Sequence, residues 1–144
     1  MAHATNYLEN KLVDHLFRTA AMAKPTALFV GLHTAAPSDA GGGTEVSGGG
    51  YARVSVPPGD ANWTATQGGT SGVSSGTNGA TANVLAVTFP VPSADWGHLT
   101  HMAIYDAPTA GNPLIWSPLA TPRDVVVGDP APRFPPGTLS VTVN

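Results

Sequence analysis

Apolar residues recur at helical spacing near the N-terminus and at strand spacing in the rest of the chain. From residue 6 to residue 23 the apolar positions repeat every three to four residues, at Leu8, Leu12, Val13, Leu16, Phe17 and Ala20. Asn6 can cap a helix, because Glu9 follows three residues later as in a capping box, and Pro25 ends the pattern. We therefore predict one amphipathic helix over 6–23, packed on a face or an edge of the remaining structure. Asp14 and Arg18 are spaced for an ion pair on its polar face.

From Thr26 onward the period changes to two, which indicates β-strands. Pro and Gly clusters separate the strand candidates, which are the run around 28–32, then 51–56, 83–89, 98–106, 114–119 with its neighbour 124–127, and 138–143. No strand alternates with a further helix, which disfavours a parallel sheet. We predict a mainly β fold, a jelly-roll-like two-sheet antiparallel β-sandwich with one N-terminal helix. A single domain, 1–144, would hold the sandwich over 26–144 with long loops at 34–50 and 57–82.

Composition narrows the choice of function. The chain has 144 residues, of which 10% are charged, and its net charge is −3. The six cations are scattered, which argues against nucleic-acid binding. Cysteine is absent and no apolar run approaches the roughly 18 residues of a membrane span. So low a charge favours association with other protein.

The residues that could carry chemistry do not form a convincing site. His98 and His101 point to opposite faces of a strand, so together with His33 they make a poor metal site. No serine lies in a nucleophile elbow, and most carboxylates occupy turn positions. Among the aromatic residues, Tyr105 and Trp116 are expected in the core. We predict no catalytic, cofactor-binding or metal-binding residues, and no enzymatic activity.

Two glycine triplets, Gly41 to Gly43 and Gly48 to Gly50, flank a short segment that contains Glu45. Neither triplet is a phosphate loop, because no lysine is near and a strand follows the second triplet. We expect the second triplet to turn the chain sharply into Tyr51, and the first to give the loop slack to reach a neighbouring molecule. The candidate protein-interaction residues are Gly41, Gly42, Gly43, Glu45, Trp63 and Trp96.

Several motifs resemble a family of small structural proteins of tailed-bacteriophage virions, labelled tail-fibre-like or structural. They are Asn6 to Leu12, Leu28 to Pro37, Glu45 to Arg53, Ala94 to Gly97 and Leu99 to Ala107. The resemblance implies a virion component with a β-sandwich core, assembled in the host cytoplasm, and offers no catalytic residues to transfer.

On this basis the sequence predicts a capsid decoration (cement) protein. Its partners would be the major capsid protein and copies of itself in a dimer or trimer, with no nucleic acid, membrane or cofactor. The alternative is a tail or tail-fibre component that contacts glycans of the host surface through Trp63 or Trp96.

Overall fold

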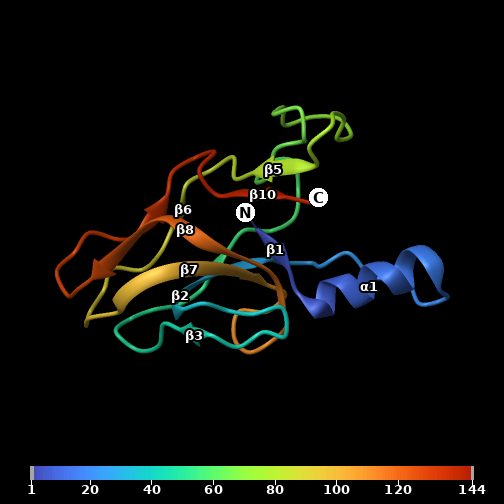
Figure 1. The fold of residues 1–144 in the computed structure, drawn as a ribbon. Helices are drawn as coiled ribbons and strands as arrows, with labels where there is room; N and C mark the ends of the chain where they lie inside the picture. Colours follow the sequence, from blue (N-terminus) through green and yellow to red (C-terminus); the bar gives the residue numbers. More distant parts are fainter. Residues whose placement is uncertain (1, 144) are drawn as a thin grey trace.

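The computed structural model describes residues 2–143 and is mainly β, with one helix in that range. Figure 1 shows the elements in order. They are β1 (His3–Ala4), α1 (Asn6–Phe17), β2 (Phe29–Ala35), β3 (Thr44–Glu45), β4 (Val54–Ser55), β5 (Ala80–Ala82), β6 (Val87–Thr88), β7 (Gly97–Tyr105), β8 (Pro113–Val125), β9 (Arg133–Phe134) and β10 (Ser140–Thr142). The predicted fold class, mainly β with an N-terminal helix, is confirmed. Within residues 2–143 no helix has the length and apolarity to cross a membrane.

The main sheet has six antiparallel strands in the order β1-β8-β7-β2-β3, with β4 also paired to β2. At its centre, β2 and β7 pair from Phe29↔Tyr105 to His33↔His101. Alternation along these two strands places Val30 and Leu32 beside Ile104 and Met102 in the core.

A second, thinner layer covers one face of this sheet. It consists of two antiparallel ribbons, β10-β5 and β6-β9. Their buried residues join the same apolar cluster as those of the main sheet: Val87, Phe89, Leu139 and Val141 against Val30, Leu32, Met102 and Ile104. The arrangement is therefore sandwich-like, but the layers are unequal and the second is not a full sheet.

Asn83 fixes the position of the C-terminal segment in the second layer. Its amide is 1% exposed, and its Nδ2 donates to the carbonyls of Leu85 and Pro135 at 2.8 and 2.9 Å. Its Oδ1 accepts from the backbone N–H of Leu139 at 2.9 Å. A buried amide is tolerated because these bonds satisfy it.

The helix differs from the prediction at both ends and in its packing. Thr5, not Asn6, is the N-cap, and its hydroxyl accepts from the N–H of Leu8 at 3.4 Å. The helix ends at Phe17 rather than at residue 23. Figure 1 shows it projecting away from the sheets, so its last turns receive little tertiary support, and a short helix depends on such support. The predicted Asp14–Arg18 pair is present at 3.3 Å.

Strand β8 joins two predicted strands, 114–119 and 124–127, into one. Among residues 2–143, β1 pairs with it only at Ile115 and Trp116, so Pro118 and Pro122 face no described strand on that edge and are tolerated there. The ladder to β7 is irregular here. Leu99 and His101 are two positions apart, whereas their partners Arg123 and Pro118 are five apart, so β8 carries three extra residues.

Candidate functional site

The segment between the glycine triplets and β4 forms a clamp on the main sheet, which we call the Glu45 clamp (Glu45, Tyr51 and Arg53). Arg53 donates from Nε and Nη2 to the two carboxylate oxygens of Glu45, each at 2.7 Å. Tyr51 donates its hydroxyl to Glu45 Oε1 at 2.9 Å and accepts from the N–H of Leu32 at 2.8 Å. A fork of this kind fixes the carboxylate in both position and orientation.

The clamp also ties the β7–β8 turn to the sheet. The Arg53 guanidinium lies 3.3 Å from the centre of the Tyr105 ring, and its Nη1 donates to the carbonyls of Ala107 and Ala110 at 2.8 and 2.9 Å. The Arg53 side chain is only 6% exposed. Gly31 leaves room for the clamp, since a Cβ there would lie 2.9 Å from Glu45 Oε1.

Electrostatics in the clamp follow from burial and pairing. Burial alone would raise the pKa of the Glu45 carboxyl, but hydrogen bonds from Arg53 and Tyr51 outweigh it and hold that pKa below its ordinary value of 4.5. Burial lowers the pKa of His33 below 6.5, although the Glu45 charge opposes the shift. The clamp therefore contains a stable ion pair beside a histidine that favours its neutral form. This is the chemistry of a structural brace.

The two glycine triplets do not have the separate roles, a sharp turn and a slack loop, that the sequence predicted. All six have positive φ values between 56° and 86°. A Cβ at Gly43 would lie 2.7 Å from the carbonyl oxygen of Ala35, and one at Gly49 would lie 3.0 Å from Trp96. At Gly42 and Gly48 a Cβ would meet no described atom within 4 Å. Each triplet therefore holds one glycine that packing requires, and the first triplet is more than slack.

The two candidate tryptophans have different environments. Trp96 is 5% exposed, donates from Nε1 to the carbonyl of Gly49 at 2.8 Å and meets the Tyr51 ring edge-on. The structure thus places Trp96 in the core, where it has little surface to offer a partner. Trp63 is half-buried against the core and borders a cavity of about 350 Å³ at the base of α1. Tyr105 is buried as expected, whereas Trp116 is half-buried and stacks on His3.

The histidines have different environments, although His33 and His101 pair across β2 and β7. His33 is buried and its Nε2 lies 2.9 Å from the Tyr105 hydroxyl, while His98 is exposed beside Asp124 at 2.9 Å. Among residues 2–143 no group of three or more His, Asp or Glu side chains is placed to hold a metal ion. Glu45, predicted as an interaction residue, is occupied by Arg53 and Tyr51.

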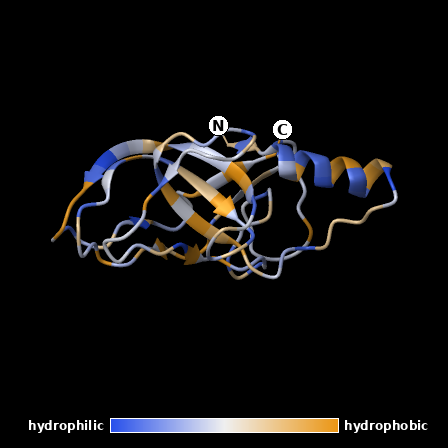
Figure 2. Cartoon of the chain, turned by 90° about the horizontal axis from the view of Figure 1, so that it is seen from below, coloured by the Kyte–Doolittle hydropathy of each residue, from blue (hydrophilic) through white to orange (hydrophobic). Residues whose placement is uncertain are grey.

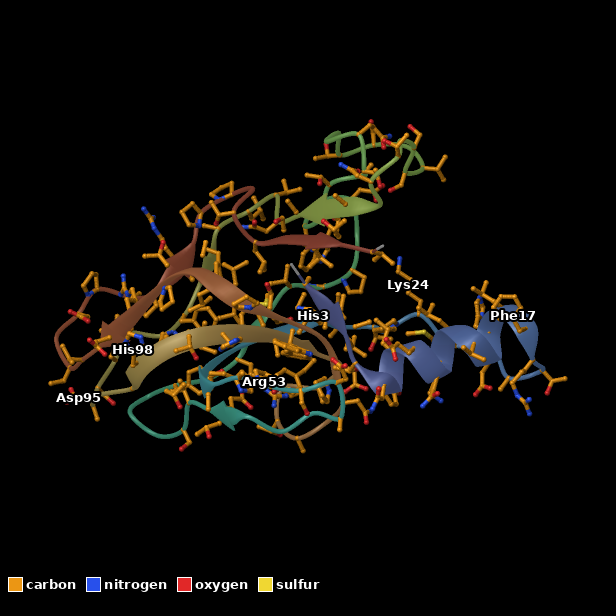
Figure 3. The ribbon with its side chains drawn as sticks, in the orientation of Figure 1. His3, Phe17, Lys24, Arg53, Asp95 and His98 are labelled. Carbon is orange, nitrogen blue, oxygen red and sulfur yellow. The ribbon has the colours of Figure 1, made fainter. Side chains whose placement is uncertain are left out.

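The exposed face of α1 was not recognised from the sequence as a surface. None of its twelve residues is buried, and Leu16 and Phe17 are 67% and 80% exposed. Figure 2 shows hydrophobic residues along the projecting helix, and Figure 3 shows Phe17 at its tip, away from both sheet layers. The apolar stripe itself was visible in the sequence, but its spacing is equally suited to packing within the chain and to packing between chains.

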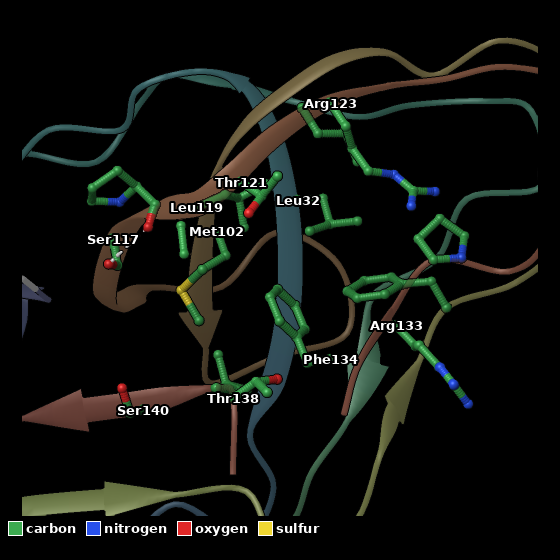
Figure 4. A pocket seen from close by; sticks show the side chains of 16 residues that line it. Leu32, Met102, Ser117, Leu119, Thr121, Arg123, Arg133, Phe134, Thr138 and Ser140 are labelled. Atoms are coloured by element: carbon green, nitrogen blue, oxygen red, sulfur yellow. Dashed lines mark hydrogen bonds between the residues drawn. The ribbon is translucent and has the colours of Figure 1, made fainter. Parts of the chain in front are cut away.

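A larger cavity, which we call the β8 cavity, opens between the two layers. It has a volume of about 600 Å³, and the extra residues of β8, Leu119 to Thr121, form part of its wall. Figure 4 shows Met102 and Phe134 among its central apolar side chains, with Arg123 and Arg133 along one side. No spacing in the sequence predicted this grouping, because the arginines come from different strands and border the same cavity only through the fold.

The chain belongs to the family described as "Podophage GP4 fiber I protein gp80", whose model matches residues 3–142. It is therefore a structural protein of a bacteriophage, with the β-rich fold described above. No curated protein matches the sequence.

Proposed function

We propose that the chain is a non-enzymatic fibre component of the phage tail and that it assembles with copies of itself through the apolar face of α1. The family description, which names a fibre protein, supports the fibre over the capsid placement. The exposed helix supports assembly: four of its apolar side chains, Leu12, Val13, Leu16 and Phe17, are substantially exposed. Full burial of a large apolar side chain stabilises by about 1.5–3 kcal/mol, which a contact between copies would supply.

The location is tested on purified virions separated into heads and tails. A gold-labelled antibody against the chain is expected to mark tails. Mass spectrometry of the two fractions is expected to find the chain in the tail fraction. Labelling confined to heads would overturn the fibre placement.

Capsid decoration remains the second candidate. The loop between β4 and β5 favours it, because it is long and mostly exposed and could follow the surface of a shell. A capsid decoration role predicts that antibody labels heads and that heads are less stable when the protein is missing.

Assembly through α1 is tested with matched valines. Val13 on α1 and Val73 on the β4–β5 loop are both exposed, at 49% and 90%. Val13→Gln and Phe17→Gln are expected to shift the chain toward monomer in analytical ultracentrifugation, whereas Val73→Gln leaves the distribution unchanged. Glutamine is a good helix former, so α1 is retained. Oligomers that persist in both helix variants would refute the role of α1.

A further inference from the structure

The β8 cavity combines features that a structural void does not require. Its volume of about 600 Å³ lies within the roughly 300–1,000 Å³ of small-molecule sites. Its floor is apolar, formed in part by the buried side chains of Leu32, Met102 and Leu139. Its rim is polar, with the exposed hydroxyl residues Thr121, Thr138 and Ser140. A saccharide presents the same combination, apolar C–H faces and hydroxyl edges.

The charge of the cavity points to an anion. Arg123 and Arg133 are two of the six cations of a chain whose net charge is −3, yet both border this cavity. None of the described residues that line it is a carboxylate. Within residues 2–143 neither arginine has an ion pair or a side-chain hydrogen bond, in contrast to Arg18 and Arg53. Their guanidinium groups are thus available to an outside acceptor, and a guanidinium binds a carboxylate through two parallel hydrogen bonds, in a bidentate manner.

The shape of β8 explains why a site exists at this position. The three extra residues between Pro118 and Arg123 interrupt the ladder to β7. Bulges commonly redirect side chains and are enriched next to functional sites. Here the bulge carries Leu119 and Thr121 to the wall of the cavity and ends at Arg123.

From these features we infer that the β8 cavity binds carboxylate-bearing sugars, with separate carboxylates on Arg123 and on Arg133 and a sugar ring over the apolar floor. The source of such a sugar rests on the proposed fibre role, because a fibre meets the polysaccharides of a host surface. The binding itself is a property of the isolated chain and is measured without virions.

The test uses galacturonic acid and its short oligomers as probes, with galactose as the neutral control, followed by isothermal titration and by NMR shift changes. Saturable binding of the uronates, with shifts centred on β8 and β9, is expected. Arg123→Gln and Arg133→Gln should each weaken it roughly tenfold or more, since bonds to charged groups are the strong ones. Arg18→Gln removes the same charge from α1 and should leave binding unchanged.

A second variant fills the cavity without changing its charge. Thr121→Trp keeps both arginines but fills the cavity from an exposed position of a strand, where tryptophan is well accommodated. It should abolish uronate binding, and circular dichroism and thermal unfolding would establish that each variant is folded. No saturable uronate binding, equal binding of galactose, or equal loss in Arg18→Gln would each overturn the assignment. Uronate binding by a chain found only on heads would sink the fibre role and leave the site standing.

Discussion

The strongest single test of the fold is Arg53→Ala. The substitution removes four hydrogen bonds, two to the Glu45 carboxylate and two to the carbonyls of Ala107 and Ala110. Breaking a buried ion pair from one side typically costs about 3–5 kcal/mol, because the remaining charge is left unpaired. The Glu45 side chain is 25% exposed, so water can solvate it in part. We therefore expect a loss near the lower limit, about 3 kcal/mol in the free energy of unfolding.

Urea unfolding followed by circular dichroism measures this loss, and thermal unfolding should show a fall in Tm of about 6–12 °C for a chain of this size. The control is Arg18→Ala, in which a 71% exposed arginine loses its helix partner Asp14. Exposed pairs contribute little, so its cost should stay below about 0.5 kcal/mol. A cost of Arg53→Ala within 1 kcal/mol of the control would refute the reasoning. The double variant with Glu45→Ala should cost less than the sum of the two single variants.

Three further predictions, which use four substitutions, follow from other contacts in the structure. Gly42→Ala should lower the free energy of unfolding by about 1 kcal/mol, because its φ is positive, and Gly43→Ala by about 3 kcal/mol, because its Cβ would also collide with the backbone. Urea unfolding measures both losses, and equal losses would contradict the contact at Gly43. Asn83→Ala should cost about 2–4 kcal/mol by leaving buried backbone groups unpaired, and an unchanged midpoint would count against its bracing role. Burial depresses the folded-state pKa of His33, so the stability that neutral His33 contributes is present above its ordinary pKa of 6.5 and is lost as the pH falls through the folded value. His33→Gln should therefore flatten the decline in the free energy of unfolding measured from pH 7 to pH 5.

Much of the architecture could be predicted from local patterns. Strand β7 follows the predicted run 98–106 nearly residue for residue, because its alternation is strong and both neighbours in the sheet are long. The two-residue strands β1, β3 and β9 had no such signal. They exist because tertiary contacts align them, as when the N–H of Thr5 bonds the carbonyl of Leu114. Local periodicity carries no information about such partners.

The candidate site was harder to predict, and the reasons differ by residue. Glu45 and Arg53 stood close together in a recognisable motif, but only the fold shows that they satisfy each other rather than a partner molecule. Trp96 was a candidate interaction residue, yet it lies in the core, where the carbonyl of Gly49 accepts its N–H. The helix stripe was predicted correctly as a stripe and wrongly as an internal contact, because amphipathicity does not state which surface covers it.

The structure separates its bracing, assembly and binding elements, and this separation has a measurable consequence. The Glu45 clamp ties the β7–β8 turn to the main sheet, whereas the exposed face of α1 and the β8 cavity share no lining residue with each other. Substitutions at independent sites act additively to within about 0.5 kcal/mol. Phe17→Gln should therefore shift the oligomer distribution without altering uronate binding, and Thr121→Trp should do the reverse. If Phe17→Gln also weakened uronate binding, the cavity would depend on a neighbouring copy, and assembly and recognition would be one function of one interface.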